Sequence, residues 1–145
     1  MAIFTGGDAV IKRISQIQRA AGAFAEVRVG FLAGSTDSNG MSNPQKAADN
    51  EYGTGHIPPR PFFRNMIKAK SPNWGQQVAK IFKANGFDSK KTLLLMGALI
   101  KRQLQEQITN EANPPPNAPL TILKKGFDKP LIDTSDMVKS VDYEV

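Results

Sequence analysis

The sequence has no cysteine and a single histidine among its 145 residues. The absence of cysteine excludes disulfide bridges, thiolate zinc sites, iron–sulfur clusters and cysteine nucleophiles, and it leaves the redox compartment undecided. The longest hydrophobic run, Leu93 to Ile100, is far shorter than the roughly 20 residues that cross a bilayer. The N-terminal residues also lack the basic stretch of a secretion signal. We therefore expect a soluble protein, made inside a cell, with no membrane contact.

Groups that support catalysis are scarce. His56 lies between Gly55 and Ile57 in an expected turn, where a lone histidine is more often an exposed polar residue than a catalytic base. The acidic residues are scattered, which disfavours a metal site, and the neighbouring Asp133 and Asp136 are interpreted as capping groups. We expect no enzyme activity, no metal and no cofactor.

Acidic residues are also rare in the middle of the chain. Residues 60–102 contain ten Lys and Arg but only one acid, Asp88, whereas residues 103–145 contain four basic and seven acidic residues. Such a block attracts phosphate backbones or an acidic protein surface, or it is simply a solvated helix face. Six of its residues are expected to be exposed and to share one positive surface: Lys80, Lys83, Lys90, Lys91, Lys101 and Arg102.

Helical periodicity is present in several segments. Residues 8–21 form an amphipathic pattern that begins at a capping Asp8 and ends at Gly22. A short helix is expected over residues 44–52, with Asn43 as its cap. Pro61 is expected to open a helix that Ser71-Pro72 interrupts, followed by a further helix that ends at Asn85-Gly86. The longest helix is expected over residues 89–110, with a stripe of Leu93, Met96, Ile100, Leu104 and Ile108 facing inward.

Strand signals lie near both ends of the chain. Alternating patterns over residues 25–32 and 141–145 predict two half-buried strands. Residues 33–43 favour turns and are a hairpin tip or a mobile loop that reaches a neighbouring subunit. Residues 113–119 predict a proline-rich connector, with a turn of helix over residues 120–124. The pattern indicates one α+β domain over residues 1–145, with a small antiparallel sheet packed against several helices.

The densest local motif is Pro59, Arg60, Pro61, Phe62 and Phe63. Prolines fix the backbone just before two large aromatic side chains, and two adjacent exposed phenylalanines would leave a large apolar surface. We expect this motif to anchor the chain, with at least one of the two phenylalanines in the core.

Three segments, in this order, resemble one protein family. They are Val27-Arg-Val-Gly-Phe-Leu with the Gly/Ser loop after it, Asn50-Glu-Tyr-Gly-Thr through Ile57-Pro-Pro-Arg-Pro-Phe-Phe-Arg, and Pro130-Leu-Ile-Asp-Thr through Ser140-Val-Asp-Tyr-Glu-Val. The combination is similar to the neck and tail-completion proteins of long-tailed double-stranded DNA bacteriophages, also described as tail-component or virion morphogenesis proteins. The similarity spans about residues 27 to 145. The family usually has glycine where this chain has Ser135, so the local turn is expected to begin differently.

The resemblance implies a structural virion protein that is assembled in the infected bacterial cytoplasm. Such a protein forms a homo-oligomeric ring, with a hexamer favoured, at the head–tail junction, between the head connector or stopper and the tail terminator. It implies no catalytic residue. A basic ring lining would contact packaged DNA without reading its sequence, although tight binding would hinder sliding, and the same face would also fit an acidic ring above or below it.

The alternative is an accessory protein that binds DNA without sequence preference. Aromatic residues are interleaved with the lysines of the basic block, but Trp74, Ile81 and Phe82 share one helical face, which is typical of core packing. The remaining signal is charge alone, which predicts contact with phosphates rather than base readout.

Overall fold

The computed structural model describes residues 7–22, 25–110 and 136–145. Within these ranges the elements are α1 (Gly7–Ala21), β1 (Arg28–Phe31), α2 (Asn43–Tyr52), α3 (Phe62–Ala84), α4 (Ser89–Asn110), α6 (Asp136–Lys139) and β2 (Val141–Glu144). The protein is mostly helical with a small antiparallel sheet, which confirms the predicted α+β class. None of the helices in these ranges is both long enough and apolar enough to cross a membrane.

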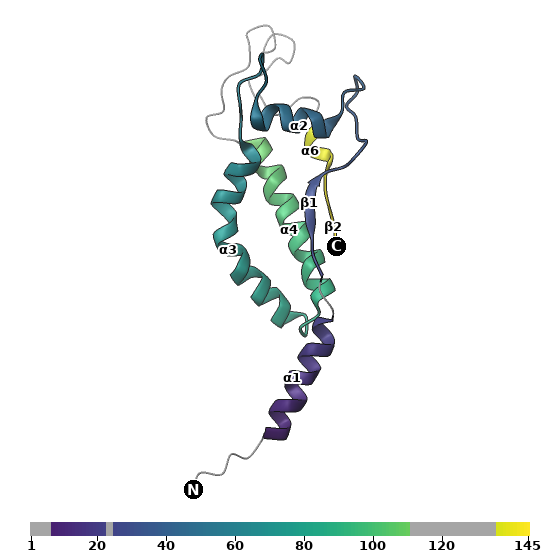
Figure 1. Ribbon diagram of the computed structural model, residues 1–145, viewed down its shortest axis with the longest axis vertical. Helices are drawn as coiled ribbons and strands as arrows, with labels where there is room; N and C mark the ends of the chain where they lie inside the picture. Colours follow the sequence, from purple (N-terminus) through teal and green to yellow (C-terminus); the bar gives the residue numbers. More distant parts are fainter. Residues whose placement is uncertain (1–6, 23–24, 111–135) are drawn as a thin grey trace.

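The molecule is elongated around a hairpin of two long helices, α3 and α4 (Figure 1). The two strands lie along α4, and α2 and α6 cover the end of the hairpin where α3 begins and α4 ends. At the opposite end α1 projects away from the body and contacts the beginning of α4 and Phe87 just before it (Figure 1). The proline-rich connector, the turn of helix over residues 120–124, Asp133 and Ser135 lie outside the described residues.

The sheet joins the two ends of the chain. β1 and β2 are antiparallel, and their register places Arg28 opposite Glu144, Val29 opposite Tyr143 and Phe31 opposite Val141. Gly97 of α4 provides the space for this sheet, because a Cβ atom at this position would collide with the ring of Tyr143. A buried glycine in a helix is therefore what lets α4 and β2 approach each other.

The core forms where the helical hairpin, the sheet and the two short helices meet. It contains Ala47, Phe62, Met66, Leu104, Ile108, Met137 and Val141, which are all at most 4% exposed. Phe62 is fully buried, and its ring lies 6.1 Å from that of Phe31 in an edge-to-face arrangement. Phe63 is partly buried against the same cluster. The predicted aromatic anchor is thus confirmed, and its aromatic contacts add to the apolar area that Phe62 buries.

The helix predicted at residues 8–21 is present as α1, and Gly22 after it has a φ of 69°, the left-handed conformation common after helices. None of its residues is buried, however. Its apolar stripe is exposed because α1 meets the body near the beginning of α4 and the rest of the helix projects away (Figure 1).

Two alternatives were predicted for residues 33–43, a hairpin tip or a mobile loop, and in the structure these residues form a closed hairpin. Thr36 and Ser42 form a β-bridge, and the buried carboxylate of Asp37 accepts hydrogen bonds from the amides of Asn39 and Met41. Lys46 of α2 binds the same carboxylate at 2.8 Å. These hydrogen bonds, above all the one from Lys46, hold the pKa of Asp37 below its usual value.

Two predictions of helix boundaries were wrong. The cap of α2 is Ser42, whose Oγ accepts the Gln45 amide, whereas Asn43 is the first residue of the helix. α3 continues through Ser71-Pro72 instead of breaking there. Pro72 is exposed, so the carbonyl of Lys68, which loses its helical donor, can bind water. Contacts between α3 and α4 keep α3 as one bowed helix (Figure 1).

The predicted long helix is present as α4, with Met96, Leu104 and Ile108 buried and Leu93 and Ile100 partly buried. Asp88 caps it by accepting the Lys91 amide at 2.9 Å. The turn before it is tight, because both Gly86 and Phe87 have a φ of 66°. Phe87 tolerates this uncommon conformation while its ring packs against Phe82.

Candidate functional site

The motif from Pro59 to Phe63 contacts α2. This helix contains Asn50, where the second segment of the family resemblance begins. Arg60 is 5% exposed, and both its backbone amide and its guanidinium donate to Asn50, the latter to Oδ1 at 3.2 Å. The turn between the two is closed by Gly53, since a Cβ there would lie 2.9 Å from the Ile57 carbonyl oxygen and 3.0 Å from Cδ of Pro59. Asn50, Gly53 and Arg60 therefore form one structural unit that fixes how α2 leads into α3.

Glu51 holds the beginning of α3. Its buried carboxylate accepts the backbone amides of Phe63 at 2.9 Å and Arg64 at 3.2 Å, and the Nε of Arg64 at 2.7 Å. A carboxylate at this place binds free amides of the first helical turn and interacts favourably with the helix dipole. The role of Glu51 was not predicted from the sequence, because its partners are 12 and 13 residues away. The only sequence feature that indicates this role is an acidic residue a short distance before a helix that follows a proline.

The predicted basic surface is divided between two places. Lys80 and Lys83 lie near the end of α3, and Lys90 and Lys91 lie in the first turn of α4, so all four flank the turn that joins these helices. All four are exposed. No ion pair of the described residues involves them. We call this surface the basic end and include in it α1, which carries Lys12, Arg13 and Arg19.

Lys101 and Arg102 do not belong to this surface. The expectation that Lys101 is largely exposed was wrong: its ammonium lies 3.0 Å from Asp142 of β2 and above the ring of Tyr143, and its side chain is 32% exposed. The helix turns this side chain toward the sheet, which the pattern of α4 alone does not reveal. The hydrogen bond from Lys101 lowers the pKa of Asp142. Arg102 is exposed, with Glu106 at 3.6 Å one turn further along.

α1 is attached to the rest of the molecule by few contacts. The hydroxyl of Ser89 donates to the carbonyl of Ala21, and the guanidinium of Arg13 lies 5.1 Å from the centre of the Phe87 ring. Val10, Ile11 and Ile14 are 49%, 63% and 50% exposed. The helix therefore presents both cations and an apolar stripe to its surroundings.

His56 is exposed, and its backbone amide donates to the Thr54 hydroxyl. No group of three or more potential metal ligands occurs in the described residues. Grooves are also present on the described residues. One, of about 480 Å³, lies between α2, α3 and β1 and is mostly apolar, with Phe31, Ala48, Tyr52, Phe63 and Ile67 in its lining.

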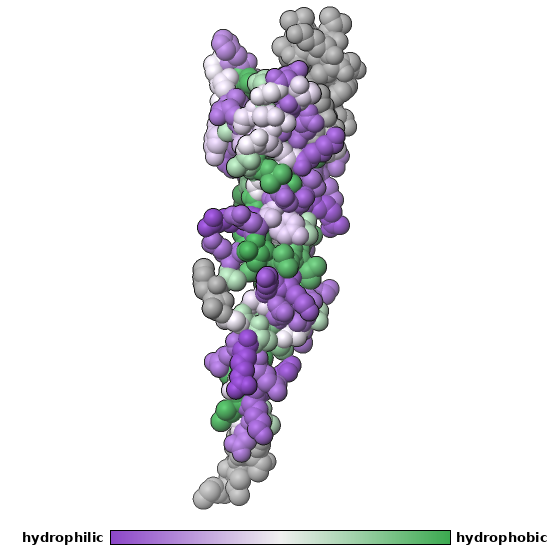
Figure 2. Space-filling view, turned by 90° about the vertical axis from the view of Figure 1, so that its right-hand side faces the viewer, coloured by the Kyte–Doolittle hydropathy of each residue, from purple (hydrophilic) through white to green (hydrophobic). Residues whose placement is uncertain are grey.

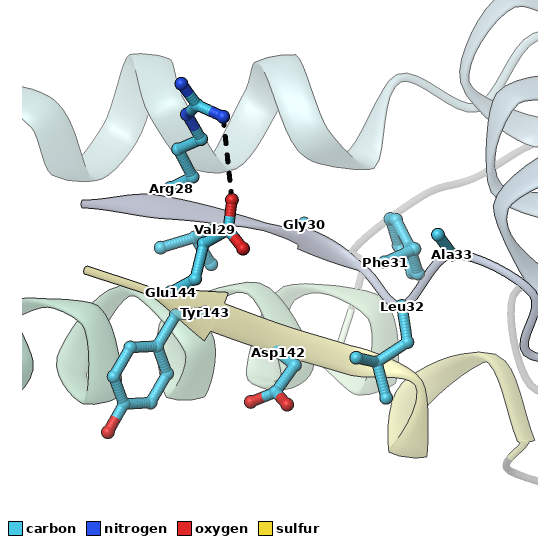
Figure 3. Close-up of a pocket in the computed structure, with 9 residues that line it drawn as sticks. All are labelled: Arg28, Val29, Gly30, Phe31, Leu32, Ala33, Asp142, Tyr143 and Glu144. Carbon is cyan, nitrogen blue, oxygen red and sulfur yellow. Dashed lines mark ion pairs between the residues drawn. The ribbon is translucent and has the colours of Figure 1, made fainter. Parts of the chain in front are cut away.

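The second groove, of about 470 Å³, follows the sheet and is lined by both strands. Figure 3 shows the ion pair of Arg28 with Glu144 at one end of the groove, Leu32 at the other, and Gly30 between them. Because Gly30 has no side chain and nothing lies within 4 Å of a Cβ built on it, the middle of the groove is open.

The basic end, with the apolar stripe of α1, and the grooves described above are available for interaction. No family model matches the chain, and neither the curated proteins nor the solved structures contain a match to it.

Proposed function

We propose that this protein is a structural virion component that forms a homo-oligomeric ring, with a hexamer favoured, at the head–tail junction of a long-tailed bacteriophage. There it completes the tail and joins it to the head connector or stopper. The resemblance of three ordered segments to neck and tail-completion proteins supports this proposal. The contacts of Asn50, Glu51, Arg60 and Arg64 are consistent with a motif that maintains the fold rather than one that performs chemistry.

The observation that carries the oligomeric part of the proposal is the exposed stripe of α1. An isolated helix of about 15 residues is marginally stable in water, and most helices are stabilised by burying one face. α1 has 15 residues, none of them buried, and three half-exposed β-branched residues along one side. A neighbouring subunit that covers Val10, Ile11 and Ile14 provides the missing packing.

Light scattering coupled to gel filtration, with negative-stain microscopy of the peak, tests this function. We expect a closed ring of one stoichiometry that forms without DNA. Ile11→Asn combined with Ile14→Asn is expected to shift the protein toward the monomer, whereas the matched pair Lys12→Asn with Gln16→Asn on the polar side is not. A monomer at all concentrations contradicts the proposal.

The second candidate, sequence-nonspecific DNA binding, is favoured by one observation: Lys80, Lys83, Lys90 and Lys91 are exposed together and no described carboxylate pairs with them. Such a cluster binds phosphates and releases counterions. In a ring, the same surface would face the DNA channel or an acidic neighbour.

Salt dependence of duplex binding separates these alternatives. Each lost phosphate contact reduces the slope of log K against log salt by about 0.9. The double variant Lys80→Gln Lys83→Gln is therefore expected to lose about 1.8, and Lys101→Gln Arg102→Gln, whose charges have acidic neighbours, clearly less. Equal slopes for wild type and both variants would assign the basic end to a protein interface or to solvent.

A further inference from the structure

The outer edges of the two strands have no partner in the described residues. β1 and β2 contain four residues each, and the sheet they form has only these two strands there. A two-stranded sheet is marginal by itself, and each of its edges presents a row of free backbone groups. Packing on α4 stabilises one face of the sheet but leaves its edges open.

The register identifies the backbone groups that point outward. The Leu32 amide donates to the Ser140 carbonyl at 2.8 Å, and the same register continues through Gly30 and Asp142 to Arg28 and Glu144. Hydrogen-bonded and non-bonded pairs alternate along an antiparallel ladder. Val29 and Tyr143 are therefore a non-bonded pair, so the amide and carbonyl of Val29 face the outer edge of β1 and those of Tyr143 face the outer edge of β2.

The charges of the two strands are opposite. β1 carries Arg28, and β2 carries Asp142 and Glu144. Arg28 lies 2.6 Å from Glu26 and 3.6 Å from Glu144 within its own subunit, and the side chains of Arg28 and Glu144 remain 70% and 74% exposed. β2 beside β2 of another copy would bring the Glu144 carboxylates together, whereas β1 beside β2 offers the exposed Arg28 guanidinium to the exposed Glu144 carboxylate.

Apolar surface accompanies these edges. Leu32 follows β1 and Val145 follows β2, and they are 47% and 46% exposed. Figure 2, which views the molecule from the side of β2, shows hydrophobic side chains gathered midway along this face, at the level of the sheet in Figure 1. An added strand would therefore gain apolar contacts in addition to backbone hydrogen bonds.

We propose that the outer edge of β1 in one subunit pairs with the outer edge of β2 in a second copy of this chain, so that the sheet continues from subunit to subunit. This inference rests on the ring function proposed above and names its interface. The contact is head to tail, since two different edges meet, and head-to-tail contacts generate closed rings when the rotation closes.

The absence of cysteine in the chain allows a direct test by single-cysteine cross-linking. Two full-length variants, Arg28→Cys and Glu144→Cys, are oxidised separately and as an equal mixture. Neither chain can form an internal disulfide, although these positions face each other within a subunit. We expect the mixture to give a cross-linked heterodimer, identified by mass, at least fivefold more abundant than the dimer of either variant alone.

A matched exposed pair, Tyr52→Cys with Arg102→Cys, serves as the control and is expected to show no such excess. Cross-linking of Arg28→Cys or Glu144→Cys with itself as the main product would overturn the head-to-tail arrangement. Rings that form while the mixture fails to cross-link would overturn the edge contact but leave the ring function standing. A chain that stays monomeric overturns both.

Val29→Pro provides a second measurement that does not depend on cysteine. It removes the outward amide of β1 and leaves the hydrogen bonds within the subunit in place. We expect association to weaken about tenfold while the circular dichroism of the monomer is unchanged. Unchanged association in a folded Val29→Pro protein contradicts the proposal.

Discussion

The two ends of the molecule differ in how they are held. We call the end formed by α2, α6, the sheet, the first turns of α3 and the last turns of α4 the sheet end. It contains the main cluster of buried hydrophobic residues and the ion pairs Lys46–Asp37, Arg64–Glu51 and Lys101–Asp142. The basic end has an exposed apolar stripe and clustered lysines, and no ion pair of the described residues lies there.

This difference separates what maintains the subunit from what is available to partners. In the sheet end, neighbouring side chains and backbone groups satisfy the buried Arg60 and Glu51, so changes there are expected to affect folding. Side chains of the basic end have few internal partners, so changes there are expected to affect association more than the stability of the subunit.

The largest effect is expected at Phe62. Truncation by Phe62→Ala leaves a cavity in the main cluster and should lower the free energy of unfolding by about 3 to 5 kcal/mol. Leu95→Ala in the second turn of α4, toward the basic end, where the side chain is 49% exposed, should change it by no more than about 0.5 kcal/mol. Urea denaturation of both variants measures the difference, and equal losses would break the comparison between the two ends.

A smaller effect is expected at the start of α3. Glu51→Ala leaves the amides of Phe63 and Arg64 without their acceptor and should cost about 2 to 3 kcal/mol. Asp88→Ala removes a single cap bond at the start of α4 and should cost about 1 kcal/mol. Thermal unfolding of the two variants would sharpen the comparison, and it would be contradicted if Asp88→Ala were the more damaging change.

Two glycines test the packing of the long helices with opposite signs. Gly97→Ala places a methyl group against the Tyr143 ring, and overpacking of about 1 to 3 kcal/mol should exceed the gain in helix propensity of about 1 kcal/mol. Gly75→Ala meets nothing within 4 Å and should stabilise α3 by up to about 1 kcal/mol. Stabilisation by both substitutions would mean that the sheet does not pack tightly on α4.

The smallest effect concerns acid stability. Because the folded pKa of Asp37 is below the ordinary 3.8, its contribution is present above about pH 4 and is lost as the pH falls through the folded pKa. Asp37→Asn should therefore lower stability at neutral pH and flatten its decline in acid. Lys46→Gln should do the same in part, since its hydrogen bond is the largest cause of the shift. Denaturation midpoints between pH 3 and pH 7 measure both, and an unchanged acid slope in Asp37→Asn would contradict the assignment.

Much of the fold could be predicted from local patterns. The extent of α4 and the end of α1 at Gly22 followed from apolar periodicity and flanking residues, and both strands from alternation, whereas α1 begins at Gly7, so Asp8 lies in its first turn and is not the flanking cap. The break at Pro72 was wrong because the proline rule is local, whereas α3 is also held by contacts with α4, such as the Trp74 indole that donates to Gln103.

The candidate site was less accessible to sequence reasoning. The turn between α3 and α4 places Lys83 and Lys90 at the same end of the helical hairpin, but nothing in the pattern of α4 shows that Lys101 contacts an acid of β2, which is 41 residues away. The same limit applies to Glu51, whose carboxylate looks like an ordinary surface acid until α3 is placed beside it.

The sequence by itself determined most of the helices, the strands, the aromatic anchor and the surplus of positive charge, because these depend on residue type and on spacing within one or two turns. Only the tertiary structure decided which cations lack acidic neighbours, which strand edges are open and that the apolar stripe of α1 finds no cover in its own subunit. The physical reason is that burial and charge pairing depend on distances between segments far apart in the chain, and packing of the long helices and the sheet sets those distances.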